Sequence, residues 1–457
     1  MEIKELLAKQ RAFFKSGATL DVDYRISHLR KLYKAIQDNE KEIYEALYKD
    51  LGKSETEGFM CEVGMVYTEI SYMLKHVRRF SKRKSVYTPL AQFASNSFIE
   101  TVPYGNTLIM SPWNYPFMLT MEPLVDAIAA GNTAILKPSA YSGNTSLVIE
   151  KIIKEVFSEE YVAVVRGGRE ENKELLDQKF DFIFFTGGQN VGKEVLRKSA
   201  DNLTPVVLEL GGKSPCIVDR SADLKLSAKR IVFGKFLNCD QTCVAPDYIL
   251  CDKEVVSEFT KELIKEIKKQ FGDSPLNNKD YGKIINSKHF NRLIGLINKD
   301  KLTYGGNFNI ETNQIEPTIL SDITEDDLIM KEEIFGPLLP IMTYEDFDTV
   351  VAELKDKPKP LALYIFSKDK KHINRVMKEL SYGGGCINDV IIHLATSEMG
   401  FGGVGESGMG TYHGKFGFEA FSHKKSIVDK KCWLDLPMRY QPYTNGLYKK
   451  LLRIFLS

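Results

Sequence analysis

The sequence lacks any apolar run of about 18 residues, so nothing in it predicts a membrane-spanning helix. Its opening, MEIKELLAKQRAFF, contains acidic side chains and no long apolar core, which excludes a typical secretory signal. Neither sign of charge is in excess, because 62 Lys and Arg residues against 61 Asp and Glu residues give a formal net charge of +1. Binding to nucleic acid is therefore not expected.

Cysteine and histidine are few and scattered. Seven cysteines in 457 residues form no dense framework of spacings, which favours a reducing, cytoplasmic setting. No HExxH pattern and no CxxC pair occurs, so no metal site is predicted. With 43% hydrophobic and 27% charged residues, the chain has the composition of a globular protein of two or three domains.

The apolar pattern predicts an α/β fold. Residues 26–52 carry apolar side chains at helical spacing among charges. From about residue 105, short apolar runs alternate with helix-length segments, which is typical of βαβ units with a parallel sheet. The expected strands are 107–111, 133–139, 162–167, 181–188, 206–212, 247–251, 361–367 and 384–389. The expected helices are 115–130, 142–157, 170–178, 189–200, 223–238, 254–271 and 369–380. Residues 81–102 fit neither pattern and are interpreted as an extended excursion.

Two residues suggest covalent catalysis. Cys243 lies among small polar neighbours in NCDQTCVAPDY (238–248), and a thiolate is a strong nucleophile. Glu209 lies upstream in VVLELGGKSP (206–215), and a carboxylate held near a thioester can activate water. Cys239 could form a disulfide with Cys243, but a spacing of four residues in a helix makes this difficult, so it is interpreted as a small buried neighbour.

Three further motifs lie at the ends of expected strands. Asn114 in SPWNYPF could donate to a developing oxyanion, or it could simply cap a turn. Lys137 in ILKPS lies where open α/β sheets bind ligands, or it is a solvated lysine. In FTGGQNVGK, Gly187 and Gly188 would admit a phosphate at a helix N-terminus and Gly192 would permit tight packing, unless this is a plain glycine turn.

Three segments in the second half remain ambiguous. In KEEIFGPLLP, Glu333 could accept bonds from ribose hydroxyls and Phe335 could pack on a flat ring, or the segment is a charged helix end. Residues 403–408 match GxGxxG, but no βαβ unit is expected after them, so they are interpreted as a glycine loop and not as a nucleotide fingerprint. The tail 443–457 could touch a membrane surface, although docking on this chain or on a partner subunit is favoured.

The order of these motifs resembles that of aldehyde dehydrogenases. PWNYP, LKPS, FTGG, LELGGK, QTC, EEIFGP and GFGGVGESGMGTYHGKFGFEAFSHKK occur in the family's order between about residues 25 and 425. The QTCVAPDY segment and the chain length resemble the class 3 branch. The resemblance implies a Rossmann-like cofactor domain, an α/β catalytic domain and a small β-rich oligomerisation flap that pairs subunits, with a homodimer expected. The implied limits are 1–81 and 103–208 for the cofactor domain, 209–417 for the catalytic domain, 82–102 and 418–435 for the flap, and 436–457 for the tail.

Residue roles follow from the same resemblance. Cys243 matches the nucleophile, Glu209 the general base, and Asn114 the oxyanion donor that works with the Cys243 backbone N–H. Five positions match the site for NAD or NADP: Lys137 and Glu333 at ribose, Phe335 beside the nicotinamide ribose, and Gly187 and Gly192 around the pyrophosphate. Asn388 in CIND resembles a residue of the substrate funnel.

Two positions depart from the family pattern. Asp240 stands where glycine usually precedes Gln-Thr-Cys, and its charge could raise the pKa of Cys243, unless the side chain points elsewhere. Ala140 stands where a glutamate often holds the adenosine ribose. Loss of that charge should relax discrimination against a 2′-phosphate, so NADP is expected to be accepted alongside NAD.

The activity implied is oxidation of an aldehyde to a carboxylic acid through a cysteine hemithioacetal and a thioester. One alternative is an acylating enzyme that passes the acyl group to coenzyme A, against which Glu209 argues, because a hydrolytic base is counterproductive there. Another is a non-catalytic binding or structural protein with the same fold. Medium or long aliphatic, or aromatic, aldehydes are the expected substrates.

Overall fold

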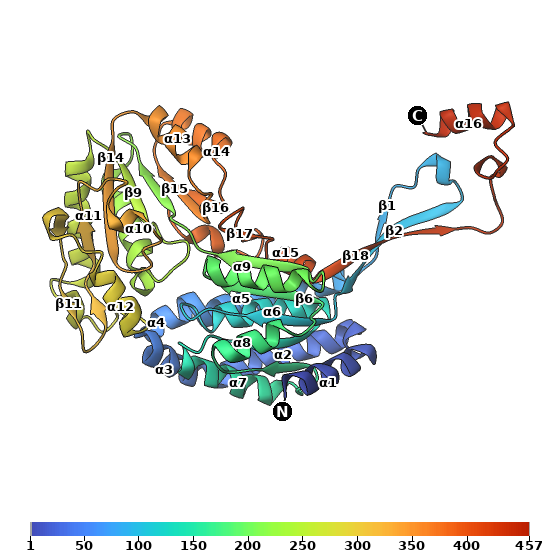
Figure 1. Ribbon diagram of the computed structural model, residues 1–457, viewed down its shortest axis with the longest axis horizontal. Coiled ribbons are helices and arrows are strands. Elements are labelled where there is room, and N and C mark those ends of the chain that lie inside the picture. Colours follow the sequence, from blue (N-terminus) through green and yellow to red (C-terminus); the bar gives the residue numbers. More distant parts are fainter. Residues whose placement is uncertain (1, 457) are drawn as a thin grey trace.

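The structure is a computed structural model that describes residues 2–456, and it comprises two α/β domains and a projecting arm (Figure 1). The first domain is built on a six-stranded sheet of order β17-β7-β6-β3-β4-β5, in which β17 is antiparallel to β7 and the other neighbours are parallel. Its strands are β3 (Asn106–Met110), β4 (Thr133–Lys137), β5 (Val162–Val164), β6 (Phe182–Gly187), β7 (Val206–Leu210) and β17 (Gly408–Met409). The strands expected in this region are confirmed. Strands β3 and β4 are buried along their whole length, and each has three consecutive apolar residues, 108–110 and 134–136.

Helices cover both faces of this sheet. Side chains alternate along β3, so Ile109 joins the core under one helical layer while Leu108 and Met110 join the core under the other. The first layer contains α2 (Val22–Asp38), α3 (Glu40–Leu51), α5 (Gly64–Phe80), α6 (Met118–Ala130), α7 (Gly143–Val156) and α15 (Gly414–Ala420), with the short α4 (Glu55–Gly58) nearby. The second layer contains α1 (Ile3–Lys15), α8 (Arg169–Leu176) and α9 (Gln189–Ala200). Every residue of α6 is buried, and the helix ends at Gly131 with φ 97°, a left-handed C-cap that glycine adopts readily.

The second domain holds a seven-stranded sheet of order β10-β13-β14-β9-β8-β15-β16, in which β10 is antiparallel to β13 and the other neighbours are parallel. Its strands are β8 (Pro215–Val218), β9 (Tyr248–Asp252), β10 (Leu302–Tyr304), β13 (Thr318–Leu320), β14 (Leu338–Tyr344), β15 (Ala362–Phe366) and β16 (Gly384–Ile387). Its helices are α10 (Leu224–Phe236), α11 (Val256–Phe271), α12 (Ser287–Ile294), α13 (Phe347–Asp356) and α14 (Lys370–Glu379), and β11 (Phe308–Asn309) and β12 (Gln314–Ile315) form a separate hairpin. The α/β class predicted from the sequence is confirmed.

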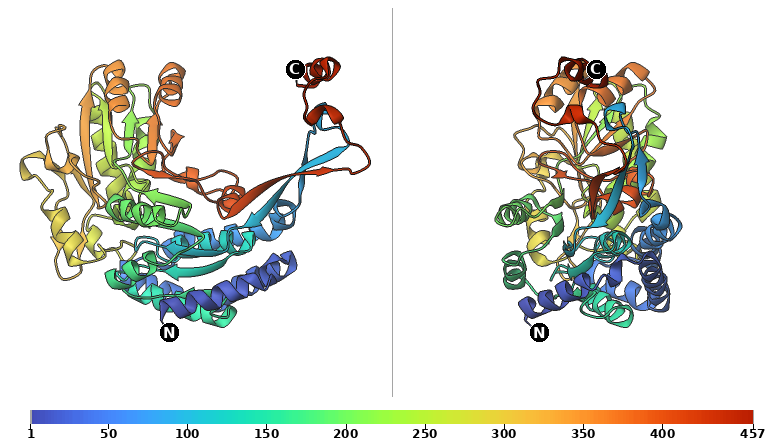
Figure 2. Two further views of the ribbon diagram at one scale, coloured as in Figure 1. Left: turned by 45° about the vertical axis from the view of Figure 1, so that its right-hand side comes forward. Right: turned by 90° about the vertical axis from the view of Figure 1, so that its right-hand side faces the viewer.

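The arm consists of a three-stranded antiparallel sheet and a terminal helix, and it extends away from both domains (Figure 1, Figure 2). Its elements are β1 (Lys84–Val86), β2 (Ser95–Pro103), β18 (Ser422–Lys430) and α16 (Gly446–Leu456). Strand β18 pairs with β2 along its whole length, so the excursion noted at 81–102 meets the end of the chain. Within residues 2–456, no helix is both long and apolar enough to cross a bilayer.

The glycine loop at 403–408 leads into β17, which pairs with β7 and is followed by α15 and the antiparallel β18. No βαβ unit follows it, in agreement with its interpretation as a glycine loop. Strand β17 and helix α15 thus bring a late segment of the chain onto the first domain, where α15 packs on α5 and α6.

Candidate active site

The segment that carries Cys243 lies against loops of the first domain. The Asn114 side-chain amide, after β3, donates to the Gln241 carbonyl at 2.9 Å. The Tyr115 hydroxyl lies 2.6 Å from the Thr242 hydroxyl. These contacts place the thiol where the two domains meet.

The backbone before the thiol is not helical. The backbone is left-handed at three successive residues, with φ 51° at Asn238, 52° at Cys239 and 61° at Asp240. Residues other than glycine rarely adopt this conformation. The premise that Cys239 and Cys243 share a helix is therefore wrong, because α10 ends at Phe236. Cys239 is buried and both thiols are free, as expected for a small buried neighbour.

Asp240 points away from the thiol. Its Oδ2 accepts from the Lys235 ammonium at 2.6 Å and from the Gly336 backbone N–H at 3.1 Å. Both side chains of this ion pair are buried. The second of the two outcomes considered for Asp240 is therefore the one observed.

The thiol lies in an acidic surrounding formed by other residues. Burial, followed by the nearby carboxyl groups of Glu333 and Glu209, raises the pKa of Cys243 to about 12, against a lowering by backbone N–H groups. The resting thiol is therefore protonated at neutral pH, and a negative charge on either glutamate opposes its ionisation.

Glu209 is buried with no bonding partner. Among residues 2–456, neither of its carboxyl oxygens has a hydrogen-bond partner, and burial raises its pKa well above the usual range. Its neighbour in register on β6 is Thr186, whose buried hydroxyl also lacks a partner within the described chain. Buried polar atoms without hydrogen-bond partners are uncommon in folded proteins. Two such groups side by side on adjacent strands therefore point to a ligand site. Sequence reasoning missed Thr186, although it lies in the FTGG motif.

Lys137 and the glycines after β6 border the same edge of the sheet. The buried Lys137 ammonium donates to the carbonyls of Pro138 and Gly167 at 3.1 and 2.8 Å, and burial lowers its pKa. Gly188 caps the N-terminus of α9, and a Cβ there would meet nothing within 4 Å, which leaves room for a phosphate. A Cβ on Gly192 would lie 2.6 Å from Leu210, so this glycine lets α9 pack closely on β7.

Gly187 ends β6 beside this opening, and a Cβ on it would lie 2.7 Å from the ring of Phe185. A lysine, glycines at a helix N-terminus and unsatisfied polar atoms at strand ends form a suitable donor set for a dinucleotide such as NAD or NADP. The residues present therefore fit the predicted cofactor.

Glu333 and Phe335 lie in a tightly held loop next to the thiol. Burial and the Asp247 carboxylate raise the pKa of Glu333 to about 8, although the Gly212 N–H and two cations lower it. Phe335 has φ 52°, and its ring meets that of Trp113 edge-on at 5.4 Å. Glu333 thus lies close enough to the thiol to influence its pKa, and Phe335 is two residues further along the chain. The cofactor roles of both residues stay predictions.

A buried ion pair supports Asn114 from behind. The Lys53 ammonium contacts Glu62 at 2.5 Å and the Asn114 carbonyl at 2.9 Å. Glu62 in turn accepts the backbone N–H groups of Phe117 and Met118 at 3.0 and 2.9 Å. Since both charges are fully buried, this pair fixes the backbone that carries the Asn114 amide. No motif in the sequence pointed to Lys53 or Glu62.

Asn388 is used within its own sheet. Its amide oxygen accepts from the Ser367 N–H at 2.9 Å, and its amide nitrogen donates to the Ser367 carbonyl at 3.0 Å. These bonds tie the end of β16 to the end of β15. Among residues 2–456, both hydrogen bonds of the Asn388 side chain go to Ser367 and neither reaches the thiol loop. Its place in the substrate funnel stays a prediction.

Comparisons with known proteins agree with this geometry. The model of the aldehyde dehydrogenase family matches residues 1–427. The chain is 46% identical to the 4,4'-diaponeurosporen-aldehyde dehydrogenase of Staphylococcus aureus (strain NCTC 8325 / PS 47), with 99% of each chain covered. It is 42% identical to the "Aldehyde dehydrogenase, dimeric NADP-preferring" of Canis lupus familiaris, with 96% of this chain and 98% of that one covered.

A solved structure entitled "Substrate bound state of Staphylococcus Aureus AldH" superimposes with a TM-score of 0.98 at 45% identity, with all of both chains covered. Sequence, fold and the arrangement around Cys243 thus lead to one conclusion. The chain belongs to the aldehyde dehydrogenase family and is an enzyme that oxidises aldehydes with NAD or NADP.

Proposed function

We propose that Cys243 is the nucleophile of this oxidation. The thiol first gives up its proton to water; the thiolate sulfur then forms a bond to the aldehyde carbon, and the carbonyl π electrons move to oxygen. The second amide N–H of Asn114 and the Cys243 backbone N–H donate to that oxyanion. A bound NAD or NADP, held by Lys137, Glu333 and the loop from Gly187 to Gly192, would supply the hydride acceptor that this oxidation needs. Collapse of the oxyanion then leaves a thioester on Cys243.

Glu209 completes the reaction. In its ionised form it takes a proton from water, the resulting hydroxide adds to the thioester carbon, and the carboxylic acid leaves as the thiol is restored. The observation that carries this assignment is the unpartnered, buried carboxyl of Glu209 beside the thiol. A group held without partners is available to water in the way that a paired one is not.

The test is Cys243→Ala, followed by absorbance of the reduced cofactor. Aldehyde-dependent formation of NADH or NADPH should disappear. Cofactor titration of the variant is the control, since cofactor binding should persist. Turnover that survives the substitution would contradict the role given to Cys243.

The cofactor roles rest on the strand ends described above. Lys137 and Glu333 are proposed to hold ribose hydroxyls, Phe335 to lie beside the nicotinamide ribose, and the loop from Gly187 to Gly192 to receive the pyrophosphate. Asn388 is proposed for the substrate funnel on resemblance alone, and its bonds to Ser367 favour a structural role instead.

NADP is proposed to be accepted alongside NAD. Ala140 is exposed and brings no negative charge to the adenosine ribose. A relative is named NADP-preferring, which supports the same proposal. The ratio of kcat/KM for the two cofactors tests it. A preference for NAD above about 100-fold, or about 2.7 kcal/mol, would reject it.

The substrates are proposed to be apolar aldehydes, aliphatic of medium or long chain, or aromatic. The relative from Staphylococcus aureus is named for 4,4'-diaponeurosporen-aldehyde, which is a candidate to include among the aldehydes tested. Rates with aldehydes of rising chain length measure the preference, and a maximum at the shortest member would contradict it.

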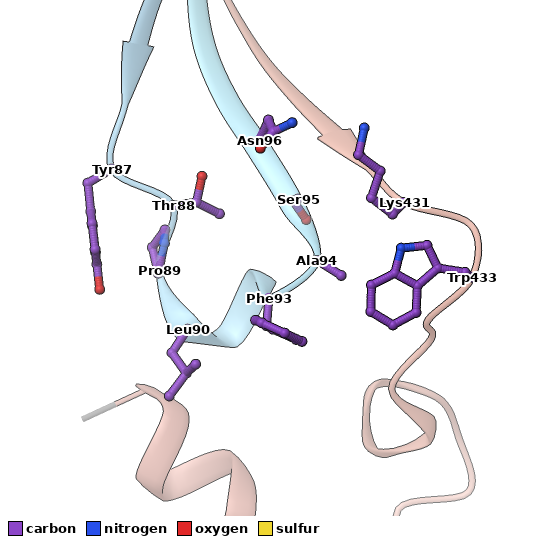
Figure 3. Close-up of a pocket in the computed structure, with 10 residues that line it drawn as sticks. All are labelled: Tyr87, Thr88, Pro89, Leu90, Phe93, Ala94, Ser95, Asn96, Lys431 and Trp433. Atoms are coloured by element: carbon purple, nitrogen blue, oxygen red, sulfur yellow. The ribbon is translucent and has the colours of Figure 1, made fainter.

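The arm is proposed to be the oligomerisation flap of a homodimer, with the domain limits expected from the sequence. Tyr87 is 84% exposed and Trp433 73% exposed, and both line a hollow between the β1–β2 connection and the segment after β18 (Figure 3). Large exposed apolar side chains on the arm favour contact with a second subunit. Helix α16 is proposed to dock at this subunit contact and not on a membrane. A relative is named dimeric. Sedimentation velocity tests the assembly, and a monomer would contradict it.

The seven free thiols fit a reducing, cytoplasmic setting, which activity in cell fractions can check.

A further inference from the structure

Asp240 contacts a loop that the mechanism uses, although it takes no part in the chemistry. Its Oδ2 is shared by the Lys235 ammonium at 2.6 Å and the Gly336 N–H at 3.1 Å. Lys235 lies on α10, and the pair is shielded from solvent, with side-chain exposures of 0% and 2%. The interaction therefore links the thiol loop, α10 and the loop that carries Glu333.

A second carboxylate on the other side of Cys243 holds the same loop. Asp247 Oδ1 accepts from the Ile334 N–H at 2.8 Å, and its Oδ2 contacts the Lys213 ammonium at 2.5 Å. Asp240 and Asp247 thus accept hydrogen bonds from the N–H groups of Gly336 and Ile334, the two residues that flank Phe335. Residues 333–336 are named here the clamped loop. Two hydrogen bonds join this loop to the segment that carries Cys243.

Both joined segments have unfavourable backbone conformations. Phe335 has φ 52°, and Asp240 itself has φ 61°. Such conformations persist only where surrounding contacts impose them. Neither segment can relax while the bond from Asp240 to Gly336 holds, so a displacement of one is transmitted to the other.

We propose that Asp240 is a positioning residue that couples the thiol to occupation of the cofactor site. Its carboxylate holds the clamped loop at a fixed distance from Cys243, and Lys235 holds the carboxylate. The inference rests on the cofactor role proposed above for Glu333 and Phe335. A Glu333→Gln variant with an unchanged cofactor Kd would reject that role separately.

The test compares two double variants that both lack the ion pair. Lys235→Met with Asp240→Asn keeps an oxygen that can accept from Gly336. Lys235→Met with Asp240→Gly removes the acceptor, and glycine tolerates φ near 61°. Removing both charges avoids an unpaired buried lysine, which would destabilise the protein by itself.

The measurements are the Kd of NAD by calorimetry, the melting temperature, and the rate at which iodoacetamide alkylates Cys243, followed by peptide mass spectrometry with and without NAD. In the natural protein, NAD should change the alkylation rate. The asparagine variant should keep most of that change. The glycine variant should lose it and should bind NAD at least about 5-fold more weakly.

The control is Glu316→Gln in the same domain. Glu316 is also a buried carboxylate that accepts a backbone N–H, from Asn307 at 3.0 Å, but it lies at the β11–β12 hairpin. It should lower the melting temperature without changing the effect of NAD on alkylation. Equal behaviour of the two double variants, whether coupled or uncoupled, would overturn the proposal.

Discussion

Carboxylates in two regions of the active site have opposite surroundings. In the supporting region, Glu62, Asp240 and Asp247 each pair with one buried or partly buried lysine and accept at least one backbone N–H. In the reactive region, neither carboxyl oxygen of Glu209 has a hydrogen-bond partner among residues 2–456. The difference lies in the partners: carboxylates that pair with a lysine and accept a backbone N–H fix the backbone, although Asp240 Oδ1 has no partner among residues 2–456, whereas the carboxyl of Glu209 is left for water.

The largest effect is expected from the reactive region, in Glu209→Gln. Loss of the general base should lower kcat by roughly 10²–10⁴-fold, while the first turnover still produces a burst of reduced cofactor. Stability should change little, because burial already favours the neutral form of Glu209 and the amide is neutral too. Burst amplitude and steady-state rate are measured on one sample. An unchanged steady-state rate would remove Glu209 from the mechanism.

Glu62→Gln, in the supporting region, should act on stability first. Lys53 would remain buried without its partner, at a cost of about 3–5 kcal/mol in the free energy of unfolding. Activity should fall as well, because Lys53 holds the Asn114 carbonyl. Denaturant unfolding measures the loss. The control is Asp38→Asn in the exposed pair with Lys34, which should give no measurable change. Equal losses in both variants would erase the distinction between the regions.

Glu333→Gln should have the smallest effect, on the reactivity of the thiol. The carboxyl of Glu333 raises the pKa of Cys243, so its removal should lower that pKa and speed alkylation of the cofactor-free enzyme. Alkylation of the natural protein should rise with pH, because thiolate forms as pH increases toward about 12. Above pH 8 this rise should flatten, since Glu333, with a pKa of about 8, becomes charged there.

In Glu333→Gln the flattening should disappear. The matched control is Glu332→Gln, an exposed neighbour that pairs with Arg292 at the surface and should leave the curve unchanged. A curve for Glu333→Gln that coincides with that of the natural protein would show that Glu333 does not influence the thiol.

Local pattern predicted most strands and helices of the first domain, but α1, α12, α13, β8, β13 and β14 were not among the expected elements. The helix expected at 115–130 is α6, Met118–Ala130, and the strand expected at 181–188 is β6, Phe182–Gly187. Their signals are local: apolar periodicity and a glycine at the helix end. Strand β18 carries the charged sequence SHKKSIVDK, so it was expected only through resemblance to a family.

The surroundings of the site residues could not be predicted in the same way. Whether Asp240 faces the thiol depends on Lys235 and on Gly336, which is far away in sequence. The bonds between Asn388 and Ser367 likewise depend on neighbouring strands of the folded sheet. The identity of Glu209 was visible in the sequence, but its isolation is a property of the packed interior.

The pairing of β17 with β7, and of β18 with β2, has a consequence for how the chain is made. The first sheet is not complete, and the arm has no third strand, until residues close to the end of the chain have left the ribosome. Contacts of such high sequence separation form slowly. Until β17 has been synthesised, the outer edge of β7 is uncovered, and an uncovered strand edge is prone to pair with other chains.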